Sequence, residues 1–167
     1  MSIVTKLTTV TLVLAMAACT NASRLGGGAT GPGAGGVVPG SAGDPSSPAY
    51  FSQTIGDRVL FAVDQSTLTP EGQSILNGQA QWLGTNADYV AVIEGHADEQ
   101  GTREYNLALG ARRANAAREY LISRGVAGNR LKTISYGKER PIEICSEEAC
   151  YAKNRRAVTV LSGGLSG

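Results

Sequence analysis

The stretch "GHADEQGTREYNLALGARRA", residues 95–114, decides the fold because one strand ends in it and one helix begins in it. The segment just before, "YVAVIEGH" (89–96), has the β-branched, alternating composition of a strand. Thr102 can cap a helix that should end at Arg124, with Gly125 in the position after the helix that favours glycine. The charged loop between strand and helix is a place where α/β proteins commonly bind ligands.

The segments around this centre predict the rest of the architecture. A strand is expected at 57–64, and a helix capped by Thr69 should follow and end at Thr85. Two further strands are expected at 130–137 and 155–162. The order β-α-β-α-β-β predicts an α/β (α+β) sandwich with two helices on one face of a mixed four-stranded sheet. The loop between the last two strands is too short for a crossover helix, so we expect these strands to be antiparallel.

The chain before this domain is predicted to consist of a signal and a tether. Residues 1–18 contain Lys6 followed by a short apolar run, which is typical of a secretory signal. Cys19 follows small residues as in a bacterial lipobox, where the cysteine is acylated; a plain signal with a chance cysteine is the alternative. Residues 19–48 are rich in Gly, Pro and Ser and are expected to form a flexible tether. The globular domain is then expected at 49–167.

Composition and residue types exclude several function classes. The chain has 15 basic and 14 acidic residues without a basic tract, so nucleic acid is an unexpected partner. His96 is the only histidine, which argues against a metal site; we expect its imidazole to be hydrogen-bonded and to orient the loop. The adjacent carboxylates of Asp98 and Glu99 point apart and are a poor glycosidase pair. We expect no cofactor and no enzymatic activity.

Two cysteines remain once Cys19 is assigned to the lipid anchor. Cys145 and Cys150 lie in the acidic loop "CSEEAC" before the last strand. An exported chain reaches an oxidising compartment, which favours a disulfide between them; two free or buried thiols are the alternative. Glu147 and Glu148 would then frame either a ligand groove or a partner surface.

The long helix places polar residues next to its buried face. At 100° per residue, Asn106 and Arg113 lie within about 20° of each other, with Leu109 beside them. The adjacent stripe faces the core and has mostly small side chains, which would bring the helix close to the sheet: Gly110, Ala114, Ala117 and Leu121. Asp98 in the loop and Arg113 on the helix would together suit a ligand with an ammonium and a carboxylate. A purely structural ion pair between them is the alternative.

The motifs "EGHADEQGTREYNLALGARRA" (94–114), "SYGKERP" (135–141) and "NRRAVTVL" (154–161) resemble those of the OmpA-like peptidoglycan-binding family. Within that family the chain is most similar to the lipoproteins of the Tol–Pal system. The resemblance implies non-covalent binding of peptidoglycan through the diaminopimelate of its stem peptides. It implies these site residues: Asp98, Arg113, Asn106, Leu109, Thr102, Phe61 and Asp64.

The same resemblance implies where the protein acts. It predicts an anchor in the outer membrane, a domain in the periplasm, and a role in envelope integrity and cell division. TolB and TolA are the implied protein partners. Binding of these Tol proteins could instead be the main function, with peptidoglycan binding secondary to it.

Overall fold

The computed structural model describes residues 37–163; Cys19, the signal and most of the tether lie outside the described residues. Between residues 37 and 163, no helix combines the length and the apolar character needed to cross a bilayer. The helices are α1 (Pro48–Tyr50), the π-helix η1 (Phe51–Gly56), α2 (Pro70–Thr85), α3 (Arg103–Ser123), the 3-10 turn η2 (Gly128–Arg130) and α4 (Glu148–Asn154). The strands are β1 (Arg58–Leu60), β2 (Val90–His96), β3 (Leu131–Gly137) and β4 (Arg156–Ser162).

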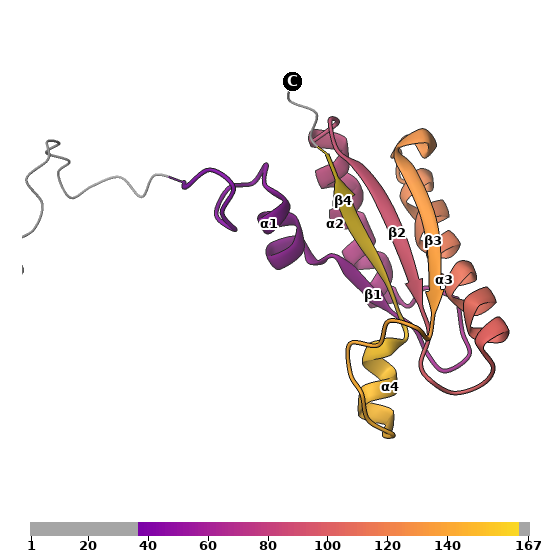
Figure 1. Cartoon of the computed structure of the whole chain (residues 1–167). Helices are drawn as coiled ribbons and strands as arrows, with labels where there is room; N and C mark the ends of the chain where they lie inside the picture. The colour runs from indigo at the N-terminus through magenta and orange to yellow at the C-terminus, as the bar shows by residue number, and fades with distance from the viewer. Residues whose placement is uncertain (1–36, 164–167) are drawn as a thin grey trace, which may run out of the picture. The chain divides into compact units, whose positions relative to one another are not determined.

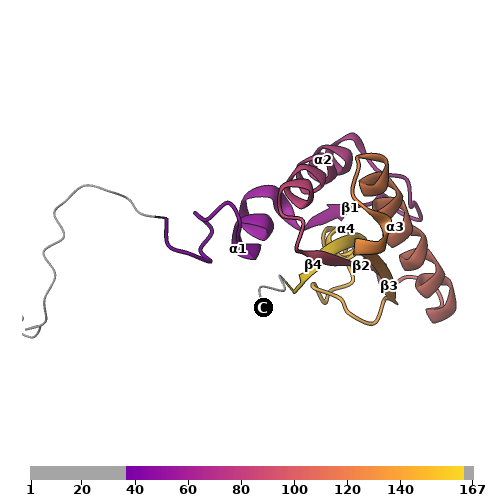
Figure 2. The ribbon, with the colours of Figure 1, turned by 90° about the horizontal axis from the view of Figure 1, so that it is seen from above.

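The four strands form one mixed sheet in the order β1-β4-β2-β3. Strands β2 and β3 are parallel, whereas β4 is antiparallel to both of its neighbours, β1 and β2. Helices α2 and α3 cover one side of this sheet (Figure 2), which confirms the predicted sandwich.

The connection before β4 differs from the sequence prediction. Strands β3 and β4 do run in opposite directions, but β2 lies between them. The connecting segment contains α4, a helix that the sequence analysis did not predict. Figure 1 shows α4 beyond the end of the sheet where β2 and β3 finish. This helix has only seven residues and no side-chain N-cap, so the local signals for a helix are weak.

The predicted helix ends are confirmed by their hydrogen bonds. Thr69 Oγ1 accepts from the Gly72 N–H at 3.1 Å, and Thr102 Oγ1 accepts from the Tyr105 N–H at 3.2 Å. Gly125 follows α3 with φ +95°, a conformation that glycine adopts without steric cost. The start of α3, which borders the charged loop, is therefore positioned by its own sequence.

Two glycines bring α3 into backbone contact with β2. A Cβ atom on Gly95 would lie 1.8 Å from the carbonyl oxygen of Gly110, and one on Gly110 would lie 2.4 Å from Ser135 Oγ. The small-residue stripe of α3 is buried as predicted. Since neither backbone can move away without opening the core, this contact fixes the loop that joins β2 to α3.

The first strand is shorter than predicted. The sequence predicted a strand over 57–64, but β1 ends at Leu60, and the Val63 side chain is 54% exposed. A turn follows, in which the Gln65 N–H donates to the Ala62 carbonyl at 3.2 Å and Asp64 adopts φ +57°. The alternation of apolar residues continues through 63 in the sequence, but the pairing ends one residue after Leu60, where the Phe61 N–H donates to the Arg155 carbonyl at 2.9 Å.

The domain begins before residue 49, the predicted boundary. Trp82 Nε1 donates to the carbonyl oxygen of Pro45 at 2.7 Å, and Ser47 is buried and caps α1. Phe51 packs on the Trp82 ring, with centroids 4.9 Å apart. The end of the predicted tether is therefore part of the folded unit, because it supplies the acceptor for a buried indole.

Candidate functional site

A cavity of about 280 Å³ lies where the β1–α2 loop, the β2–α3 loop and the start of α3 meet. Its lining comprises Val63, Asp64, Asp98, Gln100, Gly101, Tyr105, Asn106 and Leu109. Four of these residues were predicted from the sequence: Asp64, Asp98, Asn106 and Leu109. Two carboxylates and two side-chain amides thus surround a partly apolar hollow.

The carboxylate of Asp98 is nearly buried and has two different partners. Its Oδ1 accepts from the Gln100 N–H at 3.3 Å, which shapes the loop. Its Oδ2 lies 3.2 Å from Nη1 of Arg155. Asp98 therefore does form a structural ion pair, but with Arg155 at the end of α4. The alternative that paired it with Arg113 is wrong.

Arg113 does not line the cavity, although the sequence predicted it at the rim. Its side chain is fully buried. Its Nε donates to the Gln65 carbonyl at 2.8 Å, Nη1 to the His96 carbonyl at 2.9 Å and Nη2 to the Ala62 carbonyl at 3.2 Å. Burial lowers the pKa of Arg113 to about 10, so it remains charged at neutral pH. Arg113 thus joins the end of β2 to the loop after β1.

Two more predicted site residues have other contacts. The Phe61 side chain is buried, and its ring centroid lies 5.3 Å from Cζ of Arg113. The Thr102 hydroxyl oxygen is occupied as the N-cap of α3. Neither residue lines the cavity. Thr102 binds the N–H of Tyr105, which does line it, whereas Phe61 packs against the buried Arg113.

Four residues that line the cavity were not predicted from the sequence: Val63, Gln100, Gly101 and Tyr105. The Tyr105 hydroxyl donates to Asp64, which raises the pKa of Tyr105 above its ordinary value. Asn106 Nδ2 donates to the Gln100 carbonyl at 2.7 Å and closes the loop over the helix start. Tyr105 precedes Leu109 by four positions, so helical spacing alone could have placed it beside the cavity.

The predicted hydrogen bond of the His96 ring is absent. Both ring nitrogens are buried, and neither has a hydrogen-bond partner among residues 37–163. It is the main-chain carbonyl of His96 that binds Arg113, while the ring stacks on Tyr136 at 5.6 Å. Burial, together with the nearby charges of Arg156 and Arg140, lowers the pKa of His96 to about 4. The loop is therefore oriented through backbone, not through the imidazole.

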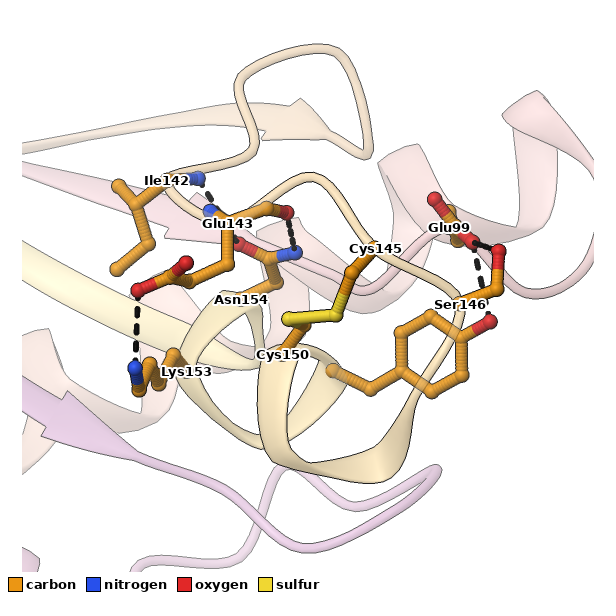
Figure 3. The surroundings of a disulfide bond; sticks show 9 residues. Glu99, Ile142, Glu143, Cys145, Ser146, Cys150, Lys153 and Asn154 are labelled. Carbon is orange, nitrogen blue, oxygen red and sulfur yellow. Dashed lines mark hydrogen bonds and ion pairs between the residues drawn. A yellow bond between two sulfur atoms is a disulfide. The ribbon is translucent and has the colours of Figure 1, made fainter.

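A disulfide joins Cys145 and Cys150, with Cα atoms 6.0 Å apart. The segment that it closes and the residue after that segment both contact the loop after β2: Ser146 Oγ lies 3.4 Å from Glu99 Oε1, and Tyr151 Oη lies 3.0 Å from the same atom. Figure 3 shows Glu99 turned towards Ser146. The carboxylates of Asp98 and Glu99 thus have different partners. They point apart, as the sequence predicted for these adjacent residues.

Comparison with known proteins shows the family and the fold of this chain. Residues 60–155 match the model of the OmpA family. Peptidoglycan-associated lipoproteins from Mesorhizobium japonicum and Rhizobium meliloti are 58% and 51% identical; the matches cover 80% and 93% of this chain and 76% and 86% of the relatives. The crystal structure of the peptidoglycan-associated lipoprotein from Burkholderia pseudomallei superposes with a TM-score of 0.65 at 37% identity, covering 72% of this chain and 98% of that one.

Proposed function

Because this chain belongs to the OmpA family, and within it to the peptidoglycan-associated lipoproteins, we propose that it binds peptidoglycan non-covalently through the diaminopimelate of the stem peptides. The observation that carries this proposal is the cavity lined by Asp64 and Asp98, together with the buried cation of Arg113, which binds carbonyls at the end of β2 and in the loop after β1. Meso-diaminopimelate presents an ammonium and a carboxylate on one carbon, so it suits a site with both signs of charge.

The ammonium would bind on the acidic side of the cavity. Asp98 supplies a carboxylate at the end of β2, and Asp64 supplies a second one that Tyr105 holds by a hydrogen bond. Leu109 offers an apolar surface for the methylene chain, and Asn106 is held in place by the loop. An ammonium has three donors, which two carboxylates and a carbonyl can accept.

Arg113 would act on the ligand carboxylate. A guanidinium has five N–H donors, and three of the five are used by the carbonyls of residues 62, 65 and 96. Arg113 is fully buried and does not line the cavity, so a direct bond to the ligand would require the turn at 62–65 to withdraw; without that movement, Arg113 would contribute only positive potential. A lysine-containing stem peptide lacks this carboxylate and should bind poorly.

The proposed cellular role combines this site with the N-terminal segment. Cys19 would be acylated and inserted in the outer membrane, with the domain facing the periplasm, and the Gly-rich residues would span towards the cell wall. The relatives are named lipoproteins, which supports this arrangement. Three acyl chains at about 0.8 kcal/mol per methylene would make the anchor stable. The protein would then connect outer membrane and cell wall as part of the Tol–Pal system.

Co-sedimentation of the full chain with purified sacculi tests the binding site. Asp98→Asn removes the charge with little change of shape, and we expect roughly a tenfold or greater loss of affinity, as for other charged hydrogen bonds. Asp88→Asn is the matched control, because Asp88 is an exposed acid that does not line the cavity. If Asp98→Asn sedimented like the control, the assignment of the cavity would be wrong.

A second candidate function, binding of the Tol proteins TolB and TolA, is favoured by one surface. The sheet face opposite the helices exposes apolar side chains on all four strands: Leu60, Val90, Ile134 and Val160. Their exposed fractions lie between 39% and 47%, an uncommon density for a surface without a partner. A pull-down with TolB in the presence of muropeptide separates the surfaces: competition indicates the cavity, and its absence indicates the sheet face.

A further inference from the structure

The disulfide-closed segment reaches the proposed binding site through a shared arginine. Arg155 is buried, and its Nη1 lies 3.2 Å from Asp98 Oδ2 and 3.3 Å from Glu148 Oε2. The Nη2 atom of Arg155 also donates to Glu148, and its Nε donates to the carbonyl of Phe61 at 3.2 Å. One cation therefore serves two carboxylates, of which one lines the cavity and the other belongs to α4.

The charges of these three groups act together with Asp64 on what the cavity attracts. Asp98 paired with Arg155 alone would have no net charge to offer an incoming ammonium. Glu148 adds a second carboxylate, and the group of three then carries one net negative charge. Its hydrogen bonds with Arg155 lower the pKa of Glu148, so the carboxylate stays ionised in the neutral range.

The segment that carries Glu148 is held from several sides. Glu148 lies between the two cysteines of the disulfide. The buried side chain of Asn154 accepts from the N–H groups of Ile142 and Glu143 at 2.9 and 3.2 Å and donates to the Glu143 carbonyl at 2.8 Å. Figure 3 shows these bonds around the disulfide. A side chain on an untied loop would not hold a bidentate contact with a buried arginine.

The same segment also contacts the residue that follows Asp98. Glu99 accepts hydrogen bonds from Tyr151 and Ser146, on either side of Cys150. Two neighbouring residues of the β2–α3 loop are thus connected to the disulfide segment, one through Arg155 and one directly.

From these contacts we propose that Glu148, held by the Cys145–Cys150 disulfide, is a positioning residue for the ammonium subsite: it shares Arg155 with Asp98 and so leaves Asp98 able to bind a cation. The inference rests on the proposed function and extends it to a segment outside the cavity. It predicts that the disulfide affects ligand affinity as well as stability.

The test measures binding of a diaminopimelate-containing stem peptide to the full chain by NMR titration. Glu148→Gln should raise Kd about three- to tenfold, because it removes one of the two carboxylates that share Arg155 in a partly solvated site. Glu147→Gln is the matched control; it removes the same charge from the neighbouring exposed residue, for which residues 37–163 provide no ion pair, and should change Kd less than twofold. Reduction of the disulfide should weaken binding in the same direction without any change of sequence.

A second peptide separates this role from a structural one. When the side-chain amine of diaminopimelate is acetylated, the ammonium is gone, and Glu148→Gln should leave the remaining affinity unchanged. Equal Kd values for Glu148→Gln and Glu147→Gln, or an equal loss for both peptides, would overturn the inference while the proposed function stands. If the unsubstituted chain bound neither peptide, the proposed function would fail, and the inference would fail with it.

Discussion

The buried imidazole of His96 makes the stability of this domain depend on pH. Its pKa falls from the ordinary 6.5 to about 4 in the folded state, because burial and the charges of Arg156 and Arg140 disfavour the protonated ring. The carboxylate of Glu94 lies 3.6 Å from Nε2, too far for a hydrogen bond. The folded state thus binds fewer protons than the unfolded state between pH 4 and 6.5. Stability from this residue is complete above pH 6.5 and is lost as the pH falls towards 4.

The size of this effect follows from the shift. At about 1.4 kcal/mol per pH unit, the loss of unfolding free energy between pH 7 and pH 4 is about 3 kcal/mol from His96 alone. His96→Phe keeps a planar ring against Tyr136 and cannot be protonated. We therefore expect the variant to be at least as stable at pH 7, because two buried nitrogens without partners are removed.

Urea unfolding of both proteins at several pH values between 7 and 4 measures the difference. Carboxylates titrate in both proteins, so their contribution cancels, and the gap in unfolding free energy should widen by about 3 kcal/mol at low pH. Ring-proton NMR of His96 gives a direct control on its protonation. Parallel stability curves for the two proteins, or a ring that is protonated at pH 6, would refute the reasoning.

Two further predictions concern packing and the disulfide. Gly95→Ala places a methyl group 1.8 Å from the Gly110 carbonyl oxygen, so β2 and α3 must separate; we expect a loss of about 3 kcal/mol or more in urea unfolding, and an unchanged midpoint would contradict the contact. Replacing Cys145 and Cys150 together with Ser opens a short loop; the chain-entropy model gives a loss of about 2 kcal/mol, and a variant as stable as the original under oxidising conditions would refute it.

Much of the architecture was predictable because its signals are local. The hydroxyls of Thr69 and Thr102 cap α2 and α3 at the residues expected, and Gly125 ends α3. The small-residue stripe of α3 indicated a close approach to the sheet. These features depend on neighbouring residues in the chain, so periodicity and capping rules detect them.

The order of the strands depends on long-range pairing. Nothing local indicates that β4 inserts between β1 and β2, because antiparallel partners can be chosen from either edge of the sheet. The helix α4 was not predicted for a related reason. Its seven residues are held by the disulfide and by Asn154, which contacts residues more than ten positions away.

The sequence by itself identified part of the site and the ends of the elements at which those residues lie. It placed Asp98 after a strand and Asn106, Leu109 and Arg113 on one flank of a helix, because both positions follow from local geometry. Only the tertiary structure decided the pairing of charges. Arg155, 57 positions along the chain from Asp98, donates to the Asp98 carboxylate, and Arg113 donates to three main-chain carbonyls instead. A buried charge binds whatever groups packing brings within about 3 Å, and sequence spacing does not record that distance.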